Sequence, residues 1–456
     1  MQYNKLYIFF IGFVAALGGF LFGYDLVLVG GANIYLRDYF DLDSVGFAFA
    51  TKSAHIGCIA GPFLGIWFCE RFDRRDVMLV SAVLLALSAI FTAIPDSILT
   101  FNIWRIVGGI GVGLCSVACP LYMAETSPKS IRGSIGLMYQ FAVITGCILA
   151  ALACYILAKL LPANVSWRWM FASEAVAIIP FTILAFIIPR SPRWLTRNGR
   201  IEEARQVLIR IGGPEHAEQE LAIIAETAGE KQGRFIELFS PGVRLALLVA
   251  VLLGLFNNLT GWTPISSYLA ALFEKAGFAK TEAILRFVFV YGFMGVLGIV
   301  PMFIIDKVGR RPLWIWSSAL MAVALVLVFL VFHYNMSGTW VLLALALTVV
   351  PHAIALGGIP WLVISELFPG NLRTKGVALA TTVLWIANFG GGFVFPLITQ
   401  QSETLYGSVG PAFLVFAVIS LLSMVFGLTL MPETRGRSLE EMGKSWKVEK
   451  DMAPPQ

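Results

Sequence analysis

The octapeptide ETSPKSIR at residues 125–132 returns as ELFPGNLR at residues 366–373, with Glu, Pro and Arg at the same spacing. Each copy directly follows a long apolar run. A second pair of charged clusters, ERFDRR at 70–75 and DKVGRR at 306–311, also follows apolar runs. The chain therefore contains two similar halves, and its fold depends on how many apolar runs each half holds.

The composition is that of a membrane protein. Of the 456 residues, 58% are hydrophobic and only 13% charged, with a mean hydropathy of +0.80. Soluble domains are about 45–50% apolar and about 25% charged. Because backbone polar groups in lipid must be satisfied within one segment, long apolar runs indicate helices. Runs of about 20 residues, the length that crosses a bilayer, lie at 6–30, 47–69, 77–95, 99–122, 134–158, 168–189, 243–271, 284–305, 312–334, 339–365, 376–400 and 408–431.

These runs predict an all-α membrane protein with 12 transmembrane helices in two pseudo-symmetric six-helix bundles. The predicted N-terminal bundle covers 1–189 and the C-terminal bundle 243–431. The linker at 190–242 contains two amphipathic stretches that predict short cytoplasmic helices. Residues 432–456 form a predicted cytoplasmic tail.

The distribution of basic residues predicts the orientation. With the N-terminus in the cytoplasm, 25 of the 33 Lys and Arg lie on the cytoplasmic side, 7 lie on the outer side, and Arg105 lies within a span. Basic loops stay in the cytoplasm, so we expect a multi-pass protein of the cell membrane with both termini inside. The six cysteines fall in or at the ends of apolar runs, which predicts packing residues rather than a disulfide framework.

The repeated charged clusters predict a cytoplasmic gate. Acids recur beside bases, so ion pairs between helix ends can hold the cytoplasmic side shut and break when it opens. Anchoring of the topology by positive charge alone is the alternative. The gate residues predicted are Glu70, Arg71, Arg74, Arg75, Glu125, Arg132, Asp306, Arg310, Arg311, Glu366 and Arg373.

A few ionisable residues lie inside the apolar runs: Asp25, His55, Arg105 and Glu174. Each costs about 2.5–3.5 kcal/mol at mid-helix on insertion scales, so each is expected to face a partner or a cavity. Asp25 and Arg105 are the obvious pair. His55 is interpreted as a hydrogen-bonded packing residue, with proton transfer or substrate contact left open.

The order and spacing of several motifs resemble the sugar porter family of the major facilitator superfamily, over nearly the whole chain. These motifs include GFLFGYD, WRIVGGIGVG, ETSPKSIRG, PRSPRWL, GGIPWLVISELFP and PETRGRSLEEM. The most similar group is the bacterial xylose–proton symporters. The resemblance implies proton-coupled sugar import by alternating access, with Asp25, Arg105 and Glu174 as the proton-coupling residues. It implies no enzymatic activity, no cofactor besides the coupling proton, no nucleic-acid partner, and a monomer in the lipid bilayer.

The resemblance also implies a sugar site of amide and aromatic side chains, which suit the hydroxyl groups and the C–H faces of a polyol. The residues that match the family's substrate positions are Phe22, Gln140, Asn257, Asn258, Thr263, Gly357, Trp361, Trp385 and Asn388.

The seventh apolar run departs from the family pattern. NNLTGWTPISSY at 257–268 replaces Q-Q-x-x-G-x-N-x-x-x-Y-Y. Asn257 and Asn258 are each one methylene shorter than Gln, while Thr263 and Ser267 replace Asn and the first Tyr. This half of the site is therefore expected to be roomier and less polar. A larger sugar, a deoxy sugar, a cyclitol or a non-sugar polyol stay open as substrates.

Two other functions stay open beside symport. An uncoupled sugar facilitator needs no proton carrier, which the presence of Asp25 disfavours. A non-transporting sugar sensor usually signals through long cytoplasmic extensions, whereas the predicted tail has only about 25 residues. Intramembrane catalysis and ATP-driven pumping are not indicated, because the sequence has no nucleophile or metal-ligand motif and no G-x-x-x-x-G-K-[ST] loop.

Overall fold

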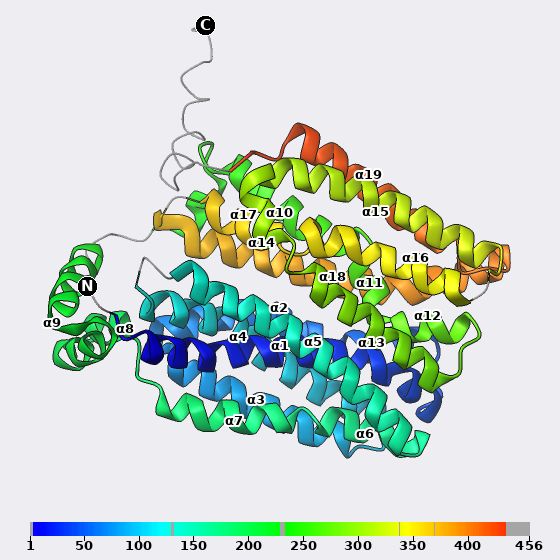
Figure 1. Ribbon diagram of the computed structural model, residues 1–456, viewed down its shortest axis with the longest axis horizontal. Helices are drawn as coiled ribbons and strands as arrows, with labels where there is room; N and C mark the ends of the chain where they lie inside the picture. The colour runs from blue at the N-terminus through cyan, green and yellow to red at the C-terminus, as the bar shows by residue number, and fades with distance from the viewer. Residues whose placement is uncertain (1–2, 129–131, 229–232, 337, 369, 435–456) are drawn as a thin grey trace, which may run out of the picture. The chain divides into compact units, whose positions relative to one another are not determined.

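A computed structural model describes residues 3–128, 132–228, 233–336, 338–368 and 370–434 (Figure 1). In these ranges the chain is helical and contains no strand. Nine of the helices described are long and apolar enough to cross a membrane. The other three predicted spans correspond to α2 (Ser44–Arg71) and to two interrupted helices.

The chain divides into two compact units. Unit 1 comprises Met1–Leu28, Ile56–Ala153 and Val165–Lys231, and unit 2 comprises Val29–His55, Cys154–Asn164 and Gln232–Gln456. The boundary therefore falls inside α1 (Lys5–Tyr39) and α2, whose first and last parts belong to different units. The division into domains at 189 and 243 remains a prediction.

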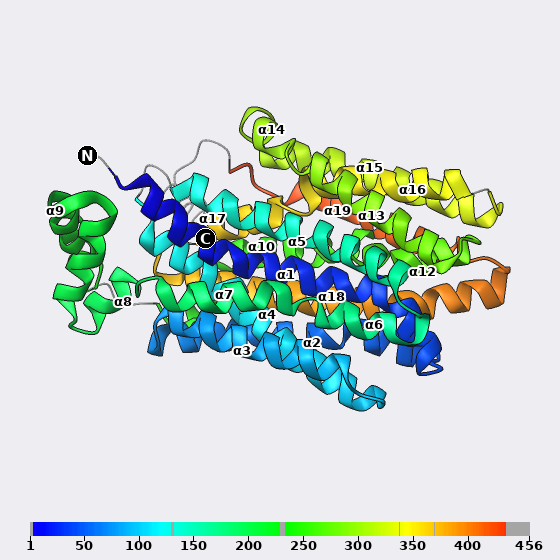
Figure 2. The ribbon, with the colours of Figure 1, turned by 60° about the horizontal axis from the view of Figure 1, so that its bottom comes forward.

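Unit 1 contains most of the first six spans. It holds the first part of α1 and the second part of α2, together with α3 (Arg74–Ala93), α4 (Ile98–Thr126), most of α5 (Arg132–Leu160) and of α6 (Ala163–Ala172), and α7 (Ala175–Ile187). Within this unit α3 packs against α4 and α7 (Figure 2). These helices match the predicted runs, and α1 is longer than its run because it continues through a polar last turn to Tyr39.

Close approach of α1 to α5 depends on Gly23. A Cβ at Gly23 would collide with the backbone carbonyl of Val143. Facing it, a Cβ at Gly146 of α5 would collide with the carbonyl of Phe20. The glycines of GGFLFGYD therefore bring the backbone of α1 against α5, which small residues at helix contacts permit in membranes.

After α8 (Pro192–Arg197), the linker continues as α9 (Ile201–Ala228). A kink at Gly213, which has φ of 85°, divides α9 into two short helices, as predicted. Before the chain enters α1, the backbone N–H of Asn4 donates to the carbonyl of Ile211 at 2.9 Å. The linker helices of unit 1 therefore hold the start of the first span.

Unit 2 contains the second set of spans. Its helices are η1 (Phe235–Phe239), α10 (Arg244–Leu259), α11 (Trp262–Ser267), α12 (Leu269–Lys275), α13 (Lys280–Leu297), α14 (Pro301–Val308), α15 (Arg310–His333), α16 (Gly338–Pro351), η2 (His352–Leu356), α17 (Ile359–Leu367), α18 (Gly370–Tyr406) and α19 (Ala412–Thr429). Within the unit α15 packs along α19, and α10 along α18 (Figures 1 and 2).

Several spans are interrupted, and the interruptions involve glycine or proline. The seventh span breaks at Gly261, whose φ of 110° suits glycine. The eighth resumes at Pro301, the first residue of α14, and the tenth passes through the π-helical turn η2 after Pro351. Non-helical backbone at membrane depth is tolerated where protein or a cavity surrounds it. The interruptions therefore mark candidate binding regions.

Candidate functional site

Asp25 of α1 and Arg105 of α4 form a buried ion pair in unit 1. Both side chains are 1% exposed. The guanidinium contacts both carboxylate oxygens, Nη1 approaching Oδ1 and Nη2 lying 3.3 Å from Oδ2. The guanidinium carbon also lies 5.1 Å from the centre of the Phe171 ring. The structure thus brings together the two side chains that the sequence pairs, in the bidentate geometry that arginine favours.

Glu174 completes this cluster. It lies at the break between α6 and α7, is 1% exposed, and interacts electrostatically with Asp25 and Arg105. Two carboxyl groups and one guanidinium share a buried site, so one bound proton balances their formal charges. Burial of uncompensated charge is costly in a membrane, which gives the cluster a reason to bind and release a proton.

A hydrogen bond between Tyr24 and Ser173 fastens α1 to the same break. Their hydroxyl oxygens are 2.8 Å apart, and Ser173 Oγ also donates to the Met170 carbonyl at 2.6 Å. Tyr24 is therefore the donor to Ser173. These residues directly precede Asp25 and Glu174, so the bond fixes the backbone beside both carboxyl groups. Sequence reasoning missed this contact, since nothing in either segment points to the other.

The two predicted substrate residues of unit 1 differ in exposure. Phe22 of α1 is half-buried, whereas Gln140 of α5 is exposed. Phe22 stands three residues before Asp25, about one helical turn away. A side chain at the predicted sugar site thus lies on the same helix as the buried carboxylate.

In unit 2 the side-chain amides of the asparagine pair at the end of α10 form hydrogen bonds with other groups of the protein. Asn257 Nδ2 donates to the carbonyls of Leu356 at 2.6 Å and Gly357 at 3.3 Å. Asn258 Nδ2 donates to the Leu384 carbonyl at 3.0 Å and to Asn257 Oδ1 at 3.2 Å. The two amides therefore hold the interrupted tenth span and α18 against α10. This role is additional to the sugar contact that the resemblance implies.

Substitution of Asn258 by Ala is expected to destabilise the protein. It leaves the Leu384 carbonyl and Asn257 Oδ1 without this donor in a buried region, at a cost of about 1–3 kcal/mol. Thermal unfolding in detergent measures the effect. Asn198→Ala is the matched control, since Asn198 is exposed and its side-chain amide donates to the Trp194 carbonyl at 2.9 Å. Equal losses in both variants would contradict a structural role for the asparagine pair.

Asn388, another substrate candidate of unit 2, contacts a residue that sequence reasoning missed, Lys52 of α2. Lys52 Nζ donates to Ser267 Oγ at 2.7 Å and to Asn388 Oδ1 at 3.1 Å, and lies 3.5 Å from His55 Nε2. The His55 ring meets Trp385 edge to face, with centroids 5.9 Å apart. Lys52 was counted with the outer basic residues, although its place inside the run 47–69 was a signal of burial.

Thr263, Gly357 and Trp361 lie in the interrupted spans of unit 2. The Thr263 carbonyl accepts a hydrogen bond from Ser267 Oγ at 3.0 Å. Gly357 follows η2, where a Cβ would lie 2.8 Å from His352 Nε2. Trp361 is 40% exposed, whereas Trp385 is 1% exposed. The two predicted pocket tryptophans therefore differ in the area they can offer to a ligand.

The predicted gate forms in part within unit 1. Arg74 Nη2 lies 2.8 Å from Glu125 Oε1, and Ser191 Oγ donates to the other oxygen of Glu125. Asp73 caps α3 by accepting from the N–H of Arg75 at 3.2 Å. Arg75 Nη1 donates to the Ile188 carbonyl at 3.0 Å, and its Nε lies 3.9 Å from Asp76 Oδ1. One ion pair and several backbone contacts thus join these helix ends.

The rest of the unit 1 cluster adds weaker contacts. Arg71 lies over the Trp67 ring at 6.0 Å. Arg190, in the motif PRSPRWL, pairs with Asp76 at 3.2 Å. The side chains of Glu70, Arg132 and Asp306, also predicted as gate residues, lie outside the described part of the structure.

The gate cluster of unit 2 is centred on a residue that the prediction omitted, Glu433. Its two carboxylate oxygens accept from the backbone N–H groups of Arg310 and Arg311, each at 3.1 Å. Arg310 also lies 3.9 Å from Glu366, and Arg373 Nε donates to the Phe368 carbonyl at 3.3 Å. The motif PETRGR, which follows the last span, was the signal for Glu433.

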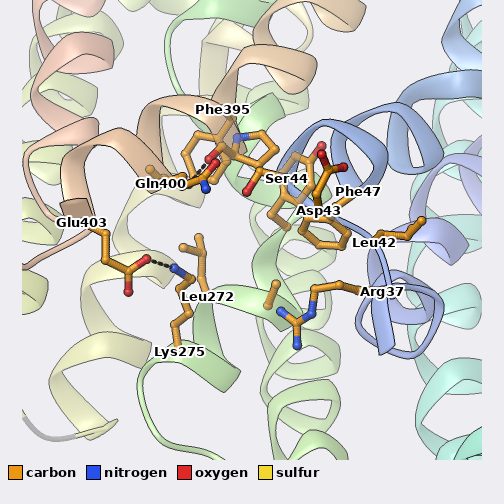
Figure 3. A pocket seen from close by; sticks show the side chains of 14 residues that line it. Arg37, Leu42, Asp43, Ser44, Phe47, Leu272, Lys275, Phe395, Gln400 and Glu403 are labelled. Carbon is orange, nitrogen blue, oxygen red and sulfur yellow. Dashed lines mark hydrogen bonds and ion pairs between the residues drawn. The ribbon is translucent and has the colours of Figure 1, made fainter. Parts of the chain in front are cut away.

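A pocket of about 290 Å³ lies at the predicted outer end of unit 2 (Figure 3). Arg37 at its edge pairs with Glu274 at 2.9 Å, and Lys275 pairs with Glu403. Aromatic side chains line another part of the pocket. Tyr268 lies with its ring centre 5.3 Å from Phe47 and 5.5 Å from Phe395. The pocket thus combines charged walls with an aromatic surface.

Comparison with known proteins identifies similar chains along nearly the whole length. Residues 11–446 match the family model described as sugar (and other) transporter. An arabinose-proton symporter of Bacillus subtilis is 33% identical over 96% of this chain and 95% of the relative. A D-xylose-proton symporter of Escherichia coli is 33% identical over 98% of this chain and 97% of the relative.

Solved structures agree with these relatives. The xylose transporter XylE from E. coli in an inward open conformation matches with a TM-score of 0.84 and 30% identity, over 96% of this chain and 100% of that one. The proton:xylose symporter XylE bound to 6-bromo-6-deoxy-D-glucose matches with a TM-score of 0.80 and 31% identity, over 97% of this chain and 100% of that one.

Proposed function

Since this chain belongs to the sugar (and other) transporter family and has the major facilitator fold, we propose that it imports a monosaccharide or related polyol together with a proton. The observation that carries the proposal is the buried cluster of two carboxyl groups and one guanidinium in unit 1. Relatives named as arabinose- and xylose-proton symporters support it. The proton is the coupling ion.

Asp25 is the proposed proton carrier, with Arg105 and Glu174 setting its proton affinity. A nearby guanidinium favours the ionised carboxylate, and a second carboxyl group disfavours it. When the distances among the three groups change during transport, the balance between these effects changes. Proton binding from outside and release inside then follow from movement of the helices that carry them.

Substrate contact is proposed for both sets of residues. Phe22 and Gln140 serve from unit 1, and Thr263, Gly357, Trp361, Trp385 and Asn388 from unit 2. Asn257 and Asn258 contribute chiefly by holding the interrupted tenth span, because their N–H groups already bind backbone carbonyls. The shorter side chains of the seventh span are the reason to include larger sugars and cyclitols beside pentoses among the proposed substrates.

Alternating access is the proposed mechanism, with residues 1–189 and 243–431 as the two moving bundles. The protein is a multi-pass protein of the cell membrane, and we place both termini in the cytoplasm on the strength of the basic residues. It works as a monomer in the bilayer. The charged clusters at the cytoplasmic helix ends hold that side shut until the transition.

Uptake into proteoliposomes tests the proposal. The purified protein is supplied with labelled pentoses, hexoses and cyclitols, with and without an imposed pH gradient. Accumulation against a concentration gradient only when the outside is acidic is the expected result. Equilibration without accumulation would show an uncoupled facilitator, and the absence of uptake of any of these solutes would favour a sensor.

Glu125→Gln is expected to shift the protein toward inward-facing states. The substitution keeps the size of the side chain but removes the charge that Arg74 pairs with at 2.8 Å. Loss of about 1 kcal/mol from one partly buried pair corresponds to about a fivefold shift in the equilibrium. The readout is the rate at which a thiol reagent modifies Gly136→Cys, where a Cβ meets nothing within 4 Å.

Gly136 lies one turn before Gln140 on α5, so the probe samples the same helix face as a proposed substrate residue. Glu202→Gln is the matched control, because that carboxylate is 73% exposed and lies in the linker. Equal modification rates in the wild type and Glu125→Gln would exclude a gating role for this pair.

A further inference from the structure

A second cavity, of about 310 Å³, lies in unit 1 where the linker meets the ends of α3 and α7. This volume is in the range of small-molecule sites, about 300–1,000 Å³. Four of the residues that line the cavity are arginines, and they come from segments far apart in the sequence: Arg75, Arg190, Arg200 and Arg210. Its charge therefore points to an anionic ligand.

Hydrogen bonds to Asp73 bring two of these arginines to the cavity. Asp73 Oδ2 accepts from the backbone N–H of Arg75 at 3.2 Å, and Oδ1 accepts from that of Ser191 at 3.0 Å. The start of α3 is thereby tied to the start of α8, beside Arg190. Both guanidinium groups then share one carboxylate, that of Asp76, at 3.9 Å from Arg75 and 3.2 Å from Arg190.

One face of α9 forms another part of the lining. Its lining residues recur every three or four positions, which places them on one side of the helix: Glu203, Gln206, Val207 and Arg210. Arg200 stands at the turn between α8 and α9, two helices that pack against each other (Figures 1 and 2). The linker therefore contributes two guanidinium groups, one amide and one carboxylate to the cavity.

The arginines of the cavity outnumber the carboxylates that neutralise them. Arg200 donates to both oxygens of Glu203, at 2.6 and 2.5 Å. Arg210 forms no ion pair among the described residues. Positive groups gathered around one cavity repel each other and concentrate anions in it. An anion bound among them would relieve this repulsion.

Glu203 occupies the position of such an anion and can be displaced from it. Its side chain is 53% exposed and belongs to the same helix turn as its partner Arg200. Exposed ion pairs of this kind contribute little to stability. When the Glu203 carboxylate turns to solvent, Arg200 and Arg210 both become available, and two guanidinium groups match a dianion.

We propose that this cavity binds a soluble phosphomonoester of sugar size, with its phosphate between Arg200 and Arg210. A phosphate group carries a charge of about −1.5 to −2 at pH 7, and the guanidinium fork fits its oxygens. The phosphate fills only part of the cavity, where the Gln206 amide can bind hydroxyl groups. None of the lining residues is a proposed substrate residue, so this site goes beyond the proposed function.

Phosphate groups also occur in lipid head groups. A soluble ligand is favoured because the lining residues of α9 lie in the polar linker, outside the apolar runs. In addition, the phosphodiester of phosphatidylglycerol carries a single negative charge, whereas displacement of Glu203 leaves two guanidinium groups to be matched.

Isothermal titration of the purified full-length protein tests the proposal. The protein is placed in phosphatidylcholine nanodiscs, in a buffer without phosphate, and titrated with glucose 6-phosphate, gluconate or glucose. The variants are Arg210→Met, Arg210→Lys and Glu203→Gln. Arg197→Met is the matched control, because Arg197 is exposed at the end of α8 and does not line the cavity. Thermal unfolding checks that each variant is folded.

Glucose 6-phosphate is expected to bind more tightly than gluconate, and glucose is not expected to bind at this site. Arg210→Met should weaken binding of glucose 6-phosphate about tenfold or more, because a hydrogen bond between charged groups is lost. Arg210→Lys should lose less, since the charge remains without the fork. Glu203→Gln should strengthen binding by removing the competing carboxylate, and Arg197→Met should leave it unchanged.

Several results would overturn the proposal: no binding of glucose 6-phosphate, equal binding in Arg210→Met and wild type, or weaker binding in Glu203→Gln. A second set of nanodiscs, containing phosphatidylglycerol, identifies the source of the phosphate. Equal affinity for glucose 6-phosphate in both sets supports a soluble ligand. Loss of its binding in the phosphatidylglycerol discs would assign the site to a lipid head group instead. Binding requires no transport, so these results stand even if the proposed function fails.

Discussion

We expect Asp25→Asn to abolish accumulation of substrate and to leave exchange intact. With the membrane potential clamped at zero, each pH unit supplies about 1.4 kcal/mol per proton, enough for about tenfold accumulation at one proton per solute. A gradient of two units therefore supports about a hundredfold ratio in the wild type. The amide cannot carry the proton, so the variant should reach a ratio of one. Uptake of labelled solute into proteoliposomes measures both ratios.

Exchange of labelled for unlabelled substrate is the second readout in the same vesicles. It needs movement of the loaded protein but no proton release, so Asp25→Asn should retain it. Asp41→Asn is the matched control, because Asp41 is exposed and has φ of 47°, a conformation that Asn tolerates. Full accumulation by Asp25→Asn would assign the coupling proton to another group.

Arg105→Met is expected to destabilise the protein by about 3–5 kcal/mol, because removal of one partner of a buried ion pair leaves the other charge uncompensated. Asp25 loses its ion pair with the guanidinium, and Glu174 loses a favourable electrostatic interaction with it. The substitution also removes the cation–π contact between the Arg105 guanidinium and the Phe171 ring. Thermal unfolding in detergent, together with the yield of folded protein, measures the loss.

The double variant Arg105→Met with Asp25→Asn separates charge from packing. Removal of the unpaired carboxylate should recover a large part of the lost stability, giving a positive coupling energy in a double-mutant cycle. Arg168→Met is the matched control in the same unit, since its partner Asp96 is 86% exposed and such pairs contribute about 1 kcal/mol or less. Absence of rescue would mean that Arg105 acts through packing alone.

Much of the fold could be predicted because membrane spans are local features. Each of the 12 apolar runs corresponds to a helix or an interrupted helix, and the two amphipathic stretches of the linker form helices separated by a kink at Gly213. What the runs concealed were the interruptions. The breaks at Gly261 and in η2 occur inside the runs 243–271 and 339–365, where the mean hydropathy of a run does not distinguish a helix from a turn surrounded by protein.

The candidate site was predictable where one residue is anomalous in its own segment. Asp25 and Arg105 stand out because a charge in lipid needs a partner, and few partners were available. The role of the asparagine pair was not predictable, since the accepting carbonyls of Leu356 and Leu384 lie about 100 and 126 residues away along the chain. Glu433 accepts from backbone N–H groups rather than from a charged partner, so its place in the motif PETRGR is its signal in the sequence.

By itself the sequence determined the number of spans, the repeat of the two halves, and the buried cluster around Asp25, because burial in lipid constrains each helix separately. Tertiary structure decided what surrounds Lys52. Its partners Ser267 and Asn388 are 215 and 336 residues away and lie on other helices. No local pattern reports such contacts, since they depend on which helix faces meet and on small residues, such as Gly392, that leave room at the meeting point.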